Sequence, residues 1–220
     1  MFEKVRALIF DMDGVLMDSE PVIKAAAIAG LKEFGVNAKI EDFEPFVGMG
    51  EDRFIGGVAE KHGVPYRPEM KKRVYEIYVD IVADELGIYE GIQEFLSEMK
   101  ERGYVLALAS SADKIKVEAN LKVTGIPVSL FSTIICGEDV EKKKPFPDIY
   151  LYAARQIGLP PENCLVVEDA ISGIKAAQAA GMQCIAVSSS FDRETLEKEG
   201  ADLVVDNTVE IASILKKSVD

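Results

Sequence analysis

The stretch VRALIFDMDG, residues 5–14, places two carboxylates directly after a short apolar run. Val5–Phe10 has the length and composition of a buried strand, and Asp11 ends it. Gly14 permits a sharp turn that would point the carboxylates of Asp11 and Asp13 in the same direction. Such a pair on its own is more often a turn or a helix cap, so its meaning depends on the rest of the chain.

Further short apolar runs follow along the chain, and helical patterns separate them. The expected strands are Val105–Ala109, Thr133–Cys136, Cys164–Val167, Gln183–Val187 and Leu203–Val205. The helical patterns between them cover Ile92–Arg102, Asp148–Gly158 and Ser172–Ala180. This alternation predicts an α/β fold with a doubly wound, Rossmann-like parallel sheet and helices on both faces.

The region from residue 15 to residue 86 breaks this rhythm. Its helical patterns cover Glu20–Phe34, Asp52–Lys61 and Pro68–Asp84, and no clear strand interrupts them. We therefore expect a small helical cap domain, residues 15–86, inserted after the first strand of a core made of residues 1–14 and 87–220. A chain of 220 residues has room for one core domain with a modest insertion.

Composition limits the partners and the compartment. The chain has 25 basic and 38 acidic residues, a net charge of −13, which disfavours nucleic acid and anionic membranes because both need clustered Lys and Arg. No apolar run approaches the roughly 20 residues of a membrane span, and we find no signal-peptide core. Three scattered cysteines indicate neither a disulfide framework nor a zinc site. We expect a soluble monomer of the cytoplasm, or of the plastid stroma if the source is a plant.

Polar side chains end several expected strands or lie in the loop that follows: Ser110, Ser111, Lys144, Glu168 and Asp169. Ligands of doubly wound sheets bind beyond the carboxyl ends of the strands. We therefore expect these groups to meet Asp11 and Asp13 at one edge of the sheet.

Crowded carboxylates of this kind suit phosphate chemistry. They repel each other, and a hard cation such as Mg²⁺, which prefers carboxylate, water and phosphate oxygens, relieves that repulsion. A carboxylate such as Asp11 can attack phosphorus and form an aspartyl-phosphate, provided that the cation and Lys144 neutralise charge. Asp13, when protonated, is placed to donate its proton to the leaving alcohol.

Four motifs in order resemble those of the haloacid dehalogenase-like hydrolases: Phe10–Val15, Ser110, Lys144-Pro145 and Val166–Ile174. The resemblance covers nearly the whole chain. The helical insertion is similar to the small cap of the β-phosphoglucomutase-like and phosphoglycolate-phosphatase-like subgroup. Gly48–Phe54 and Ala109–Asp113 look especially like hydrolase domains of plant plastid proteins.

This resemblance implies roles for the carboxylates. Asp11 would be the nucleophile and a metal ligand. Asp13 would be the general acid and base, and its backbone carbonyl would also bind the metal. Asp169 would bind Mg²⁺, with Glu168 beside it as a second ligand or a supporting partner.

The resemblance assigns the remaining groups to substrate binding. Ser110 and the adjoining Ser111 would hold the phosphate, and Lys144 would neutralise it. A cap loop would set specificity: Gly48, Gly50, Glu51 and Arg53. The implied substrate is a small phosphorylated metabolite, such as a sugar phosphate, and the implied reaction is its hydrolysis.

Two other functions stay open. Mutases of the subgroup carry a histidine where this chain has Ile23, and they carry cap cations without a clear counterpart here. Since a mutase must hold a second phosphate with cationic donors, these departures favour hydrolysis. The second alternative is an inactive domain that serves as an interaction module, which the retained catalytic groups disfavour. The dehalogenase branch, which uses a single aspartate and no metal, is poorly supported because Asp13 and Asp169 are both present.

Overall fold

The structure, a computed structural model, describes residues 2–215. Their main sheet has six parallel strands in the order β5-β4-β1-β6-β7-β8. The strands are β1 (Ala7–Phe10), β4 (Val105–Ala109), β5 (Thr133–Ile135), β6 (Cys164–Glu168), β7 (Gln183–Val187) and β8 (Leu203–Val205). The expected doubly wound parallel sheet is therefore confirmed.

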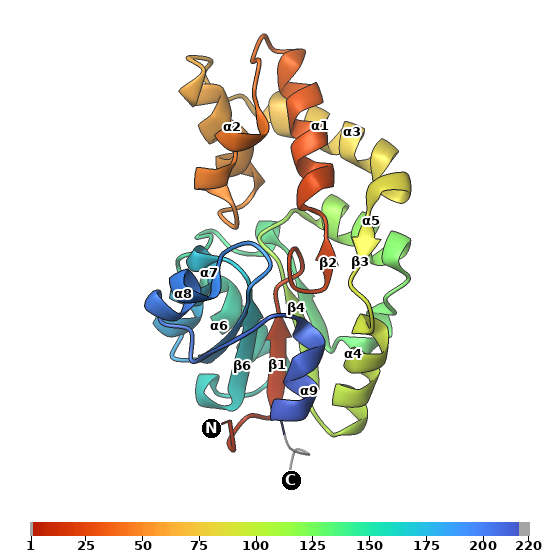
Figure 1. The fold of residues 1–220 in the computed structure, drawn as a ribbon, viewed down its shortest axis with the longest axis vertical. Helices are drawn as coiled ribbons and strands as arrows, with labels where there is room; N and C mark the ends of the chain where they lie inside the picture. The colour runs from red at the N-terminus through yellow and green to blue at the C-terminus, as the bar shows by residue number, and fades with distance from the viewer. Residues whose placement is uncertain (1, 216–220) are drawn as a thin grey trace.

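Helices cover both faces of this sheet (Figure 1), because alternate residues of its central strands are apolar on both sides. Leu8 and Phe10 belong to the face covered by α4 (Ile92–Glu101), α5 (Lys114–Thr124) and α9 (Ile211–Ile214). Ala7 and Ile9 belong to the face covered by α6 (Asp148–Ile157), α7 (Ile171–Ala179) and α8 (Arg193–Lys198). Within residues 2–215, no helix has both the length and the apolar character that a membrane crossing requires.

Three helices stand beyond the carboxyl ends of the strands: α1 (Glu20–Lys32), α2 (Glu51–Lys61) and α3 (Pro68–Glu85). They bury a hydrophobic cluster of their own, in which Ile55, Val74 and Tyr78 are fully covered. The chain enters and leaves this helical group through β2 (Met17–Asp18) and β3 (Gly87–Ile88), which pair antiparallel. The sequence pattern does not reveal this pairing, because two residues are too few to show a period.

Candidate active site

Three neighbouring strands deliver polar groups to one edge of the sheet. Asp11 directly follows β1, and its backbone N–H donates to Val167 of β6 at 2.9 Å. Ser110 directly follows β4, and Glu168 is the last residue of β6. Because these strands are parallel and adjacent, their carboxyl ends meet, and Asp11, Ser110 and Asp169 line one pocket.

Lys144, which lies in the loop after β5, is the cation at the centre of this edge. Its Nζ lies 2.5 Å from Asp11 Oδ1 and 2.5 Å from Glu168 Oε1, and the side chain is almost fully buried. Tyr150 of α6 donates its hydroxyl to the same Glu168 oxygen at 2.8 Å. The ammonium is therefore held in one position, between a carboxylate of β6 and the carboxylate that follows β1.

Burial outweighs the effect of Lys144 on the pKa values of the carboxyl groups around it. Burial raises the pKa of Asp11 to about 7, against the effect of Lys144, and Glu168 and Asp13 add to the rise. Burial also raises the pKa of Asp169 well above its usual range, with further contributions from Glu168 and Asp11. Burial works against the charged form of Lys144, but its two carboxylate partners raise the pKa of its ammonium overall.

Asp169 and Glu168 are positioned by different contacts. Glu168 Oε2 accepts the backbone N–H groups of Asp169 and Ala170, each at 2.8 Å, so both of its oxygens have partners. The carboxylate of Asp169 accepts the hydroxyl of Ser190 and lies against Gly14. A Cβ on Gly14 would lie 1.9 Å from Asp169 Oδ2, and φ there is +74°, so the turn requires glycine for two reasons.

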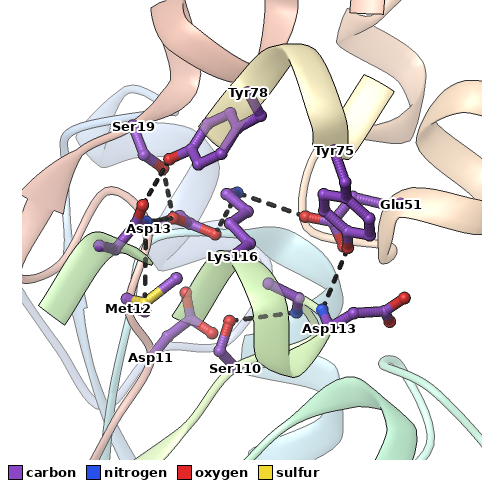
Figure 2. Close-up of polar contacts among 12 residues, drawn as sticks. Asp11, Met12, Asp13, Ser19, Glu51, Tyr75, Tyr78, Ser110, Asp113 and Lys116 are labelled. Carbon is purple, nitrogen blue, oxygen red and sulfur yellow. Dashed lines mark hydrogen bonds and ion pairs between the residues drawn. The ribbon is translucent and has the colours of Figure 1, made fainter. Parts of the chain in front are cut away.

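Asp13 is held from several sides (Figure 2). Its Oδ1 accepts the hydroxyl of Ser19, and its Oδ2 lies 2.8 Å from Lys116 Nζ. Asn120 Nδ2 lies 3.5 Å from Oδ1 of Asp13, while its own Oδ1 accepts the Tyr78 hydroxyl at 2.6 Å. The side chain of Asp13 thus touches groups from the start of α1 and from α5, and through Asn120 it is linked to α3.

Four residues around Asp13 were not expected from the sequence: Ser19, Lys116, Asn120 and Tyr78. Lys116 and Asn120 lie on α5, which is absent from the helices expected there. Their spacing of four residues, shortly after Ser110, is the signal that could have found them, because residues i and i+4 share one helix face.

Of the residues expected to form the specificity loop, three line the pocket and Arg53 lies at the surface. Gly48 and Gly50 line the pocket, and the Gly48 carbonyl accepts the hydroxyl of Ser172 at 2.9 Å. Glu51 is buried and lies 3.3 Å from Lys116 Nζ. Arg53 does not line the pocket. Its side chain is 57% exposed, and its guanidinium lies 3.6 Å from the carboxylate of Glu60.

The two serines expected at the site directly follow β4 at the same edge of the sheet. Ser110 and Ser111 both line the pocket, and the Ser110 hydroxyl accepts the Ala112 backbone N–H at 3.1 Å. Ile23, which stands where related mutases carry a histidine, also lines it. A cavity of about 60 Å³ between the six-stranded core and the helices α1–α3 thus brings carboxylates and a buried ammonium together. Such a set of groups in one cavity is typical of hydrolase active sites.

Comparisons with known proteins give the family. Residues 8–187 match the model of the haloacid dehalogenase-like hydrolase family, to which this chain belongs. The chain is 32% identical to a phosphorylated carbohydrates phosphatase of Thermotoga maritima, over 97% of this chain and 99% of that protein. A crystal structure of CbbY from Rhodobacter sphaeroides in complex with phosphate superposes with a TM-score of 0.83 at 29% identity, covering 94% and 96% of the two chains.

A plant protein is also similar over this region. The protein SUPPRESSOR OF QUENCHING 1, chloroplastic, of Arabidopsis thaliana is 44% identical over 93% of this chain. The match covers 20% of that protein, so the chain spans about a fifth of this relative's length. Family membership and relatives that include phosphatases place the chain with the phosphoric monoester hydrolases.

Proposed function

We propose that the chain is a Mg²⁺-dependent phosphatase that hydrolyses small phosphorylated metabolites of the sugar-phosphate type. The observation that carries this proposal is the buried Lys144, which lies 2.5 Å from both Asp11 and Glu168 at the strand ends. An ammonium held against a carboxylate, next to a serine that follows the adjacent strand, is the arrangement that a phosphorylated substrate needs.

Asp11 attacks phosphorus and displaces the alcohol, while Asp13 donates a proton to the leaving oxygen. The resulting aspartyl-phosphate is then attacked by water, from which Asp13 removes a proton, and phosphate and free Asp11 result. Ser110, the backbone that follows it at Ser111, and Lys144 bind the phosphoryl oxygens in both steps. Lys116 and Ser19 hold the Asp13 carboxylate in place between the two transfers.

The acidic groups at the strand ends fit a magnesium ion by their chemistry. Asp11 and Asp169 are buried oxygen donors whose pKa values burial raises, and the carboxylate of Glu168 adds to both rises. A cation beside them would offset this cost of carrying negative charge in a buried site. Within residues 2–215, no three acidic, histidine or cysteine side chains are already arranged as a metal cage. Asp11, Asp169 and the Asp13 carbonyl would hold the ion. Glu168 would keep Asp169 in position, because its Oε2 accepts the backbone N–H of Asp169. When bound, Mg²⁺ supplies positive charge that offsets the repulsion between the phosphate and Asp11.

The helices α1–α3 act as a lid on this site. The cavity of about 60 Å³ is far below the roughly 300–1,000 Å³ of typical small-molecule pockets, so we infer that the lid opens to admit substrate. The paired strands β2 and β3 mark the two chain crossings about which it moves. The enzyme acts as a monomer on small molecules, in the cytoplasm or, in a plant, the plastid stroma.

The proposal is tested with an aryl phosphate, with and without Mg²⁺. We expect turnover that EDTA abolishes, and loss of at least about 10³-fold in kcat for Asp11→Asn, because the amide is no nucleophile. Asp84→Asn, an exposed change of the same kind on α3, is the matched control and should keep full activity. No metal-dependent turnover across a panel of phosphate esters would favour the interaction module instead. Conversion of β-glucose 1-phosphate to glucose 6-phosphate faster than phosphate release would favour the mutase.

A further inference from the structure

One wall of the pocket carries a buried carboxylate that the proposed chemistry does not use. Glu51, the first residue of α2, is 7% exposed and lines the same pocket as the catalytic aspartates. Its Oε1 faces Lys116, whereas its buried Oε2 has no hydrogen-bond partner within the described residues. Tyr75 lies beside it: burial raises the pKa of that phenol, and the charge of Glu51 and a side-chain hydrogen bond with its carboxylate add to the rise (Figure 2).

A second buried polar atom without a partner lies in the same wall. The hydroxyl of Ser111, on a side chain that is 9% exposed, has no hydrogen bond within residues 2–215. It is close to the cap loop, because a Cβ on Gly50 would lie 3.8 Å from Ser111 Cβ. A carboxylate oxygen and a hydroxyl are thus left unsatisfied on either side of the boundary between lid and core. Buried polar groups of this kind normally have hydrogen-bond partners, so we expect a bound ligand to provide the missing ones.

The cations of the pocket are already engaged. Lys144 and Lys116 are the cations that line it among the described residues, and each lies between two carboxylates. Arg53, which the sequence placed in the specificity loop, is directed away to Glu60. Once Lys144 binds the reacting phosphate, residues 2–215 leave no free cation in this wall for a second anion. The negative charge of Glu51 would repel such an anion.

We propose that Glu51, with the Ser111 hydroxyl, selects phosphate monoesters of neutral polyhydroxy alcohols and rejects those whose alcohol carries a carboxylate or a second phosphate. Burial raises the pKa of Glu51, and the ammonium of Lys116, 3.3 Å away, opposes that rise and favours the ionised form. An ionised carboxylate only accepts hydrogen bonds, so its free oxygen fits a hydroxyl donor of the substrate. A like charge placed beside it in a desolvated site is repelled. This inference rests on the proposed phosphatase function and narrows its substrate class to polyol and sugar monophosphates.

Two substrates that differ by a single group test the inference. Glycerol phosphate carries a hydroxymethyl group where phosphoglycerate carries a carboxylate. We expect a kcat/KM at least about ten-fold higher for glycerol phosphate in the wild type, because like charges are repelled in a desolvated site. Glu51→Gln keeps the shape, removes the charge and frees Lys116 for an anion, so this ratio should fall about ten-fold. The ratio is taken within one variant, so a change in folding or in basal activity cancels.

Glu60→Gln is the matched control, because it removes the same charge from an exposed position of the same helix. Its ratio should equal that of the wild type. Equal use of both substrates by the wild type, or an unchanged ratio in Glu51→Gln, overturns the inference. If either of these results is found while the aryl phosphate is still hydrolysed, the substrate selection by Glu51 is refuted and the phosphatase proposal is kept. Absence of any turnover, aryl phosphate included, overturns both.

Discussion

Replacing Lys144 with methionine tests the electrostatics of the site most directly. The change keeps much of the chain length but leaves Asp11 and Glu168, both buried, without the ammonium that lies 2.5 Å from each. Removing one partner of a buried ion pair typically costs about 3–5 kcal/mol, because the remaining charge is uncompensated. For a chain of this size each kcal/mol lowers Tm by about 2–4 °C, so we expect a decrease of roughly 6–20 °C.

The decrease should depend on pH with a definite sign. The pKa of Asp11 in the folded protein is about 7, above its ordinary value of 3.8, so the folded state binds more protons than the unfolded state between these values. Stability from this group therefore falls as pH rises through that window. Lys144 opposes the rise, so its loss raises the pKa of Asp11 further, and the variant should lose more stability at about pH 8 than at about pH 5.5.

The assay is thermal unfolding in metal-free buffer, since a bound cation would mask the effect. Lys142→Met is the control, because Lys142 is exposed in the same charge run and its contact is with the ring of Phe146. We expect it to cost less than about 1 kcal/mol. A Lys144→Met protein that melts within the error of the wild type, or that loses the same Tm at both pH values, would refute this account of the site.

Two further variants probe the neighbourhood of the site. Gly14→Ala should raise the Mg²⁺ concentration needed for half-maximal activity and lower Tm, because its Cβ would overlap Asp169 Oδ2. Gly35→Ala, at a similar positive φ with nothing within 4 Å, should show only the backbone cost of about 1–2 kcal/mol, and equal effects would contradict the overlap. Tyr78→Phe should lower the free energy of unfolding by about 1–3 kcal/mol in urea titrations, since it leaves the buried Asn120 oxygen without its 2.6 Å hydrogen bond. An unchanged midpoint would count against that contact.

Much of the core could be predicted because its signals are local. The ranges expected for β4, β7 and β8 agree with the structure residue for residue, and each is a short apolar run. Fully buried strands of a parallel sheet are apolar on both faces, so their composition alone marks them. The elements that were missed lack such a signal: β2 and β3 have two residues each, and α5 carries Lys116 and Asn120 on a buried face.

The same division applies to the candidate site. Asp11, Ser110 and Glu168 could be placed at one edge because each ends a strand, and parallel topology brings such ends together. Arg53 and Lys116 could not be placed in this way. Whether a helical side chain reaches the pocket depends on how its helix is rotated against its neighbours, which packing of α2, α3 and α5 decides.

The sequence by itself determined the parallel sheet, the pair Asp11 and Asp13, and the order of the groups that meet them. These follow from apolar runs and the polar residues that end them, which act over a few residues of chain. Only the tertiary structure decided that Lys116 holds Asp13, that Arg53 faces solvent and that Glu51 is buried in the pocket wall. Those placements arise from contacts between segments far apart in the sequence, because burial and charge pairing are properties of the packed chain rather than of any single stretch.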